Sequence, residues 1–415
     1  MVTKRGVLPR RSRVPSLSAF EPGEFIAPLI CTAVVLTLIS IFAAGVVLLA
    51  AVLCWISDGV KRRRVVLGLP AFSPWLLAFL GAGVIAIAAS PDLLASLKYL
   101  EKFVRFLWVF VFFGYASRRQ IEKTLYWIFG VVSASALWGL LQYCWFENID
   151  LMHRIDGFMS HWMTFSGQVM MSAVMIAAFL LFRPKQKGEW KWLRLLLWLA
   201  LAVLMTACLL SMTRSAWLGL STGIGLLLVL RHLRLAIPGA LVLVLVLIFL
   251  PAQFKARLYS GFDLNDTTTQ GRVELAETGI EMIRLHPWTG VGPRLVQQTA
   301  VRLKRSDGFP PELFQHLHNN ALQIAAEMGL PALLIWLGFW IRVVVDLWRF
   351  RSSGDEFLCF LAHAALAALL SFQLMGLFEY NFGDSEIVVL LFFIISAPYV
   401  VGSSYRVYEG NSRVS

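Results

Sequence analysis

The sequence predicts an all-α polytopic membrane protein with about 12 transmembrane helices, and three observations lead to this fold class. Of the 415 residues, 58% are hydrophobic and 15% are charged, which is far more apolar than the composition of globular proteins. Apolar runs of about 20 residues, the length that crosses a hydrocarbon core of roughly 30 Å, recur along the chain. One long polar stretch, residues 252–317, interrupts them. Together they exclude a soluble enzyme.

Each predicted span rests on its own apolar run. The first two runs are nearly continuous and too long together for one ordinary span, so we divide them as a tight hairpin. The predicted spans are 25–41, 43–57, 70–89, 97–115, 122–143, 163–182, 192–210, 215–231, 234–250, 319–347, 357–378 and 385–402.

Basic residues in the short connections set the orientation, because loops rich in Lys and Arg stay in the cytoplasm. The first twenty residues are basic and carry no cleavable signal pattern, so they indicate a cytoplasmic amino-terminal tail. Every short basic loop then falls inside: Lys61 to Arg64, Arg118 with Arg119, Arg183 with Lys185 and Lys187, Arg231 with Arg234, and Arg349 with Arg351. Much of the net charge of +12 therefore reflects orientation rather than nucleic-acid binding.

The polar stretch divides the chain into three predicted parts. Residues 1–250 hold nine spans, residues 251–317 form one large external loop, and residues 318–415 hold three spans and end in the cytoplasm. Within the loop, Thr267 followed by Gln270 is a capping-box pattern and predicts the start of an amphipathic helix. The helical periodicity ends before Pro287, where a turn dense in glycine and proline follows.

Cysteines and nucleotide-binding motifs give no sign of a cofactor. The five cysteines all fall in apolar runs, and the chain has no phosphate-binding glycine loop and no GxSxG nucleophile pattern. His316 and His318 stand two residues apart, yet no carboxylate or thiol cluster nearby completes a metal site, which makes metal binding the lesser alternative. We expect no cofactor and no metal, so the energy for any synthesis has to arrive in the substrate.

Arg214 lies at the external end of the eighth span, where the other short loops lack basic residues. An arginine at this depth is costly unless an anion or a wet cavity accompanies it, although it can also snorkel to the interface. The guanidinium presents a planar set of donors that matches phosphate oxygens. Arg214 is therefore a candidate phosphate ligand.

Other external basic residues extend this candidate site. Lys102 and Arg105 lie at the external end of the fourth span, and Arg154 lies in the external connection between Cys144 and Trp162. Snorkelling explains the first two equally well, and Asp156 is an alternative partner for Arg154. Tyr380, Asn381 and Asp384 in the last external turn are explained by turn formation as readily as by substrate contact.

His318 begins the tenth span, and Asn319 follows it directly. A neutral imidazole at the boundary between water and membrane accepts a proton near physiological pH. The sequence therefore predicts a general base at this position.

These residues resemble three motifs of the O-antigen ligase and O-antigen polymerase superfamily of bacterial envelopes. The first is Arg214 with Leu218 four residues later; the second is Gly271-Arg272 leading through the amphipathic helix to His286-Pro287-Trp288-Thr289-Gly290-Val291-Gly292-Pro293. The third is His318-Asn319 followed by nine residues and Gly329. The chain departs from the ligase pattern at Ala332, where that pattern has Gly, Thr or Tyr.

The resemblance implies a GT-C-type glycosyltransferase of the bacterial inner membrane whose active site faces the periplasm. Its partners are expected to be undecaprenyl diphosphate-linked O-antigen, the lipid A-core acceptor and membrane lipids, without nucleic acid. We hypothesise that His318 is the general base and that Arg214 and Arg272 hold the departing diphosphate in an inverting, metal-independent reaction. The expected substrate-binding residues are Asn319, Arg154, Lys102, Arg105 and His316.

Three alternatives stay open at this point. A polymerase of the same superfamily uses a second lipid-linked glycan as acceptor, and a protein O-oligosaccharyltransferase uses a protein. A transporter for an anionic solute also places basic residues at membrane depth, with Arg214 and Lys102 as binding residues and His318 as a proton relay. The absence of inverted sequence repeats disfavours the transporter.

Overall fold

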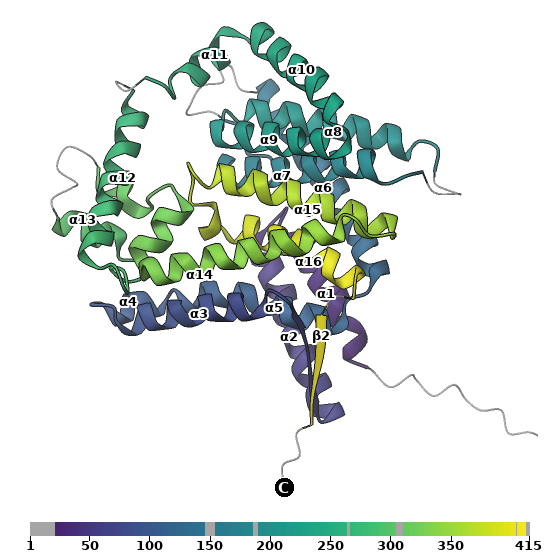
Figure 1. Cartoon of the computed structure of the whole chain (residues 1–415), viewed down its shortest axis with the longest axis vertical. Helices are drawn as coiled ribbons and strands as arrows, with labels where there is room; N and C mark the ends of the chain where they lie inside the picture. Colours follow the sequence, from purple (N-terminus) through teal and green to yellow (C-terminus); the bar gives the residue numbers. More distant parts are fainter. Residues whose placement is uncertain are drawn as a thin grey trace, which may run out of the picture.

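The computed structural model describes residues 21–145, 154–185, 190–263, 266–303, 310–403 and 405–411. Residues 1–20 of the predicted cytoplasmic tail, and Lys187, lie outside the described residues. Regular structure in the described part is almost entirely helical (Figure 1). The elements of the bundle are α1 (Gly23–Leu36), α2 (Ile41–Arg62), α3 (Ser73–Ala88), α4 (Leu93–Leu97), α5 (Leu100–Tyr115), α6 (Arg118–Trp145), α7 (Trp162–Phe182), α8 (Leu193–Leu210), α9 (Arg214–Arg231), η1 (Leu233–Leu235), α10 (Ala236–Phe249), α14 (Asn320–Phe350), α15 (Glu356–Met375), η3 (Asn381–Gly383) and α16 (Ser385–Val401).

Every apolar run that the sequence marks as a span contains a helix. Six helices, α2, α6, α7, α8, α14 and α15, are long and apolar enough by themselves to cross a membrane. Helix α10 with its preceding turn makes a bent pair with α11 (Ala252–Tyr259), at an angle of 109°. Helices α1, α3 and α16 are apolar but shorter. The chain is thus an all-α protein with the helices of a multi-pass membrane protein, and twelve crossings stay a prediction.

The helices form one bundle around a buried centre. Most of α7, α15 and α16 is buried, and these helices pack on each other and on α9 and α5. Helix α10 has no buried residue and exposes apolar side chains on all sides. Such a surface suits lipid, because an apolar helix that faces hydrocarbon needs no protein cover.

The first two helices confirm the predicted hairpin division. Helix α1 ends at Leu36, and Ser40 caps α2 by accepting a hydrogen bond from the backbone N–H of Ala43 at 3.3 Å. The two helices pack extensively on each other. A short polar cap therefore breaks an apolar run that one span could not accommodate.

A small sheet was not predicted from the sequence. Strand β1 (Arg64–Pro70) pairs antiparallel with β2 (Tyr405–Asn411), with Arg64 opposite Asn411. The pair runs beside the end of α2 and projects from the bundle (Figure 1). Because its strands come from opposite ends of the chain, no local pattern joins them.

The segment predicted to be the external loop is partly helical, as predicted. It contains α11, α12 (Thr267–Leu285), α13 (Val296–Arg302) and η2 (Pro311–Gln315), which gather at one end of the bundle (Figure 1). Helix α12 has the predicted bounds, but the predicted capping residue is wrong. The cap is Asp266, whose side chain accepts from the backbone N–H of Thr269 at 3.2 Å. Aspartate there is an equally good acceptor and precedes the threonine by one residue.

The turn after α12 is locked onto a break in α14. Gly329 interrupts the helical backbone of α14 with a φ of 85°, and Gly290 in the turn has a φ of 69°. The backbone N–H of Val291 donates to the carbonyl of Ala326 at 2.8 Å. A Cβ on Gly290 would lie 2.3 Å from the carbonyl carbon of Glu327, so only glycine permits this approach. The lock fixes the first turns of α14, which carry the candidate site.

Candidate active site at the loop end of the bundle

His318 is held in place by the start of α14. Its own backbone is left-handed, with a φ of 47°, and Asn319 caps the helix by accepting from the backbone N–H of Leu322 at 2.9 Å. The amide of Asn319 also donates to the carbonyl of Leu377 at 3.0 Å. The beginning of α14 is therefore tied to the segment that follows α15, and the imidazole faces that segment.

A buried carboxylate joins His318 to Arg272. Glu379 is only 5% exposed, and its Oε2 lies 3.0 Å from Nδ1 of His318. Its other oxygen, Oε1, accepts from Nη2 of Arg272 at 3.0 Å. An ionised carboxylate only accepts, so it pairs with the tautomer that carries the proton on Nδ1, and a neutral ring in that tautomer keeps the lone pair on Nε2. The arrangement leaves one ring nitrogen free to take a proton from a substrate.

Glu379 was not identified from the sequence. It follows directly on the eleventh predicted span, in the same external connection as Tyr380. The reasoning applied to Arg214, that a charge at the membrane boundary needs a partner, applies equally to this carboxylate and would have found it.

Arg214 reaches from the first turn of α9 towards the loop. Its Nη1 donates to Oγ of Ser260 at 3.0 Å and to the carbonyl of Arg257 at 3.4 Å. The charges of Arg272 and Glu379 act on it, so it lies within electrostatic range of both. The structure joins Arg272 and His318 through one carboxylate, and Arg214 lies within electrostatic range of that carboxylate.

A fourth arginine joins this group without any sequence signal. Arg257 on α11 donates from Nε to the carbonyl of Met212 at 3.4 Å. Burial, together with the positive charges of Arg214, Arg154 and Arg272, lowers its pKa to about 10. We call Arg154, Arg214, Arg257 and Arg272 the arginine cluster. Holding like charges together in a partly dry site is unfavourable unless an anion joins them, so the cluster suits an anionic ligand.

Arg154 forms the edge of the arginine cluster. Its guanidinium lies 4.8 Å from the ring centroid of Trp162, and the ring of His161 stacks on the same indole at 4.3 Å. Burial lowers the pKa of His161, which favours the neutral imidazole. A planar guanidinium stacked on an indole is oriented rather than free to rotate, which preserves its donor geometry.

Lys102 belongs to a separate cluster beside His318. Its Nζ lies 5.4 Å from the ring centroid of Tyr99 and 5.8 Å from that of Tyr380, and the two hydroxyl oxygens are 3.1 Å apart. The ring of His316 lies 5.3 Å from that of Tyr380. We call Tyr99, Lys102, His316 and Tyr380 the lysine–tyrosine cluster. His316 and His318 thus have different neighbours, Tyr380 and Glu379.

The remaining predicted binding residue, Arg105, is buried and is hydrogen-bonded to backbone carbonyls of the protein itself. It is 7% exposed, and it donates to the carbonyl of Gly383 at 3.1 Å and to that of Lys102 at 2.9 Å. These contacts hold the last external turn against α5. Its contact with substrate stays a prediction, as do those of the other proposed binding residues.

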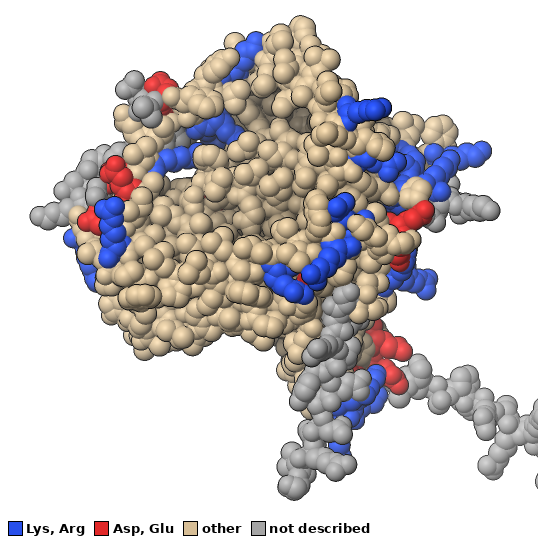
Figure 2. Space-filling view, viewed as in Figure 1, with Lys and Arg blue, Asp and Glu red and all other residues tan. Residues whose placement is uncertain are grey.

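Figure 2 shows the surface hollowed between the α11–α12 side of the molecule and the bundle. Lys and Arg side chains gather along the border of this hollow (Figure 2). The opening gives a bulky substrate access to the loop end of the bundle.

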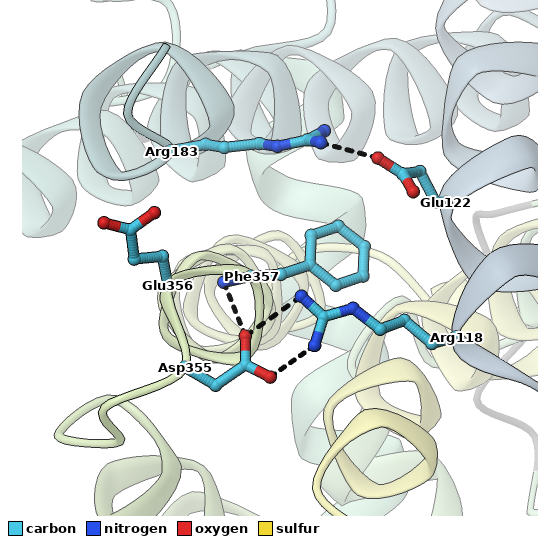
Figure 3. Close-up of a pocket in the computed structure, with 6 residues that line it drawn as sticks. All are labelled: Arg118, Glu122, Arg183, Asp355, Glu356 and Phe357. Carbon is cyan, nitrogen blue, oxygen red and sulfur yellow. Dashed lines mark hydrogen bonds and ion pairs between the residues drawn. The ribbon is translucent and has the colours of Figure 1, made fainter. Parts of the chain in front are cut away.

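A second pocket lies at the opposite end of α15 (Figure 3). It has a volume of about 340 Å³, and its charged side chains other than Glu356 form two ion pairs. Arg118 forms a bidentate pair with Asp355, while Arg183 donates to Glu122 at 2.5 Å. The ring of Phe357 lies between the two pairs (Figure 3).

Residues 199–337 match the family model described as O-antigen ligase. This match confirms the resemblance that the motifs predicted, and the matched segment contains Arg214, Arg272 and His318. A search of curated proteins found no match.

Proposed function

We propose, from the premise that residues 199–337 carry the O-antigen ligase family domain, that the chain is an O-antigen ligase of lipopolysaccharide synthesis. Members of this family are membrane glycosyltransferase-like enzymes, and their substrates are polysaccharides and lipid-linked glycans. The proposed reaction transfers O-antigen polysaccharide from undecaprenyl diphosphate to a sugar hydroxyl of the lipid A core. The site faces the periplasm of the bacterial inner membrane, in a GT-C-type arrangement of twelve spans.

The observation that carries this proposal is the line from Arg272 through Glu379 to His318, with the other arginines beside it. In the proposed step, Nε2 of His318 takes the proton of the acceptor hydroxyl while the hydroxyl oxygen attacks the anomeric carbon. The bond from that carbon to the diphosphate oxygen breaks, and undecaprenyl diphosphate departs with the electron pair. One displacement inverts the anomeric configuration.

The arginine cluster stabilises the charge that develops on the leaving diphosphate. Fixed donors in a partly dry site act more strongly than water does and need no rearrangement during the reaction. Several guanidinium groups supply the positive charge that many sugar transferases draw from a divalent cation. We therefore propose that the reaction is metal-independent.

A polymerase of the same superfamily is the second candidate, because the chain departs from the ligase pattern at Ala332. Ala332 is fully buried in α14, so this departure does not by itself identify the acceptor.

The test is a transfer assay with the purified full-length chain in lipid nanodiscs, an undecaprenyl diphosphate-linked glycan as donor, and a chelator present throughout. Lipid A-core and a second lipid-linked glycan are offered as acceptors in separate reactions. Glycan on lipid A-core supports the ligase, whereas growth of the lipid-linked glycan alone supports the polymerase and contradicts our proposal.

The same assay tests the general base. His318→Ala should reduce the rate on the order of 10³-fold, because a positioned base contributes about 10²–10⁴. His232→Ala is a matched control, since His232 is exposed at the far end of α9 and should leave the rate unchanged. Full activity of His318→Ala would refute the mechanism.

A further inference from the structure

The two charged clusters reach the neighbourhood of His318 through different residues. Glu379 presents one oxygen to Arg272 of the arginine cluster and the other to His318. Tyr380, which follows Glu379 directly, contacts the ring of His316 and lies under Nζ of Lys102. Glu379 and Tyr380, adjacent in the sequence, therefore belong to two different sets of contacts.

The clusters also come from different parts of the fold. The arginine cluster is built by α9, α11, α12 and the segment before α7, while the lysine–tyrosine cluster is built by the start of α5 and the connections around η2 and η3. The charged groups that act on Lys102 are Arg105, Glu327, Arg294 and Glu101, and none of these belongs to the arginine cluster.

The lysine–tyrosine cluster is organised before any substrate binds. Tyr99 is 5% exposed, and its hydroxyl contact with Tyr380 at 3.1 Å fixes both rings. The two rings hold Nζ of Lys102 over their faces, which reduces the conformational freedom that a long side chain loses on binding. The side chain of His316 is exposed at the surface, yet partial desolvation by its neighbours and the charge of Lys102 lower its pKa to about 4, so its ring is neutral at pH 7. The cluster thus combines one cation with apolar ring faces, and these suit an anionic sugar.

The chemistry of the proposed reaction assigns a side to each substrate. In a single displacement, the attacking hydroxyl and the leaving group lie roughly in line on opposite faces of the anomeric carbon. The base has to touch the attacking hydroxyl, within about 2.6–3.2 Å. If the arginine cluster binds the leaving diphosphate, the acceptor approaches His318 from another direction. The lysine–tyrosine cluster contains His316, two residues before His318, and Lys102 is its cation.

We infer that Lys102, His316 and Tyr380 form the acceptor subsite, and that the acceptor carries a phosphate or carboxylate near the hydroxyl that attacks. This assignment rests on the proposed function. Lys102 binds the anionic group, and the ring of Tyr380 packs against the apolar face of the sugar. The acceptor is then held by a charge distinct from those that hold the donor.

The test measures donor and acceptor separately, with the full-length chain in nanodiscs. Lys102→Met should raise the acceptor KM about tenfold or more, as loss of a charge-assisted contact predicts, and leave the donor KM and kcat within about twofold. Lys102→Arg should restore much of the affinity. Lys98→Met is the matched control, because Lys98 is exposed near the same helix end, and it should change neither KM. Arg257→Gln should raise the donor KM instead.

Modified acceptors identify the anionic group. Removing the phosphates, or reducing the carboxyl groups, should weaken binding to the wild type and remove the difference between wild type and Lys102→Met. The inference would be overturned if the wild type and Lys102→Met differed as much with a neutral acceptor as with the anionic one. It would also be overturned if Lys102→Met raised only the donor KM.

A binding measurement separates this inference from the proposed function. Direct binding of the anionic acceptor to the wild type and to Lys102→Met requires no turnover. If the wild type binds the acceptor through Lys102 but transfers nothing, the proposed reaction fails and the subsite stands. If transfer proceeds and Lys102→Met binds the acceptor as well as the wild type does, the subsite assignment alone fails.

Discussion

The two ends of α15 carry similar residues in opposite electrostatic arrangements. At its start, Arg118 and Arg183 each meet a carboxylate, Asp355 and Glu122, and the ring of Phe357 fills the space between them (Figure 3). Beyond its end, Glu379 is shared by Arg272 and His318. In the two pairs at the start of α15, each arginine is therefore neutralised by a carboxylate.

Beyond the end of α15, the described residues include more arginines than carboxylates. Among them, Arg214, Arg154 and Arg272 lower the pKa of Arg257, and Asp266 raises it. Arginine at the boundary of a membrane is therefore not itself a sign of ligand binding. What distinguishes the candidate site is the excess of guanidinium groups over carboxylates, because that excess is costly until an anion arrives.

Changing the arginines at the loop end is the strongest way to break this comparison. Arg272→Ala should reduce the rate on the order of 10²–10³-fold, as loss of a donor to a developing anion does. Arg214→Lys should fail nearly as badly, because an ammonium cannot reproduce the planar donor set of Arg214. Transfer rates at saturating donor measure both effects. A fully active Arg214→Lys would mean that charge alone matters there.

Glu379→Gln should reduce kcat on the order of 10²-fold with little change in the acceptor KM. The carboxylate positions His318 and fixes which ring nitrogen carries the proton, and an amide in its place no longer specifies that tautomer. Glu379→Asp should retain more activity than Glu379→Gln. A purely structural role predicts instead that both variants lose thermal stability and kcat together, which a melting curve beside the kinetics detects.

His316 makes the loop end of the bundle sensitive to acid. Its folded pKa is about 4, below the unfolded value of about 6.5, so the unfolded chain binds the proton first. The stabilising effect of the neutral ring is complete above about pH 6.5 and is lost as the pH falls towards 4. Melting temperatures across this range should fall less for His316→Gln than for the wild type. Parallel curves would refute the assignment.

Arg118→Ala should have the smallest effect. Its pair with Asp355 is largely exposed, and such pairs contribute about 0–1 kcal/mol to stability. We expect a slight fall in melting temperature and an unchanged transfer rate. A loss of transfer comparable to that of Arg272→Ala would show that the comparison between the two ends of α15 is wrong.

Local patterns in the sequence identified much of the fold and part of the site. Apolar runs located the helices, and the breaker-rich turn before Pro293 marked the end of α12. The pairing of Arg64 with Asn411 could not be found this way, because register between distant strands depends on the tertiary fold.

In the site too, some residues could be found from local sequence patterns and others only from the tertiary fold. Arg214 stood out because it breaks the charge pattern of the short loops, whereas Arg257 is one of several basic residues in a long loop and only the fold brings it to the others. Glu379 could have been found from the sequence, because it is a charged residue at the end of an apolar run and needs a partner there. Asp266 replaced Thr267 as the cap because both residues fit that position and only the backbone decides between them.

The central claim is that surplus arginine charge at the loop end binds the lipid-linked diphosphate. Titration of undecaprenyl diphosphate into nanodiscs that hold the wild type, Arg257→Gln or Arg118→Gln, followed by native mass spectrometry, tests it directly. We predict that Arg257→Gln weakens binding about tenfold or more and that Arg118→Gln binds as the wild type does. Equal binding by all three proteins, or a loss confined to Arg118→Gln, would contradict the claim.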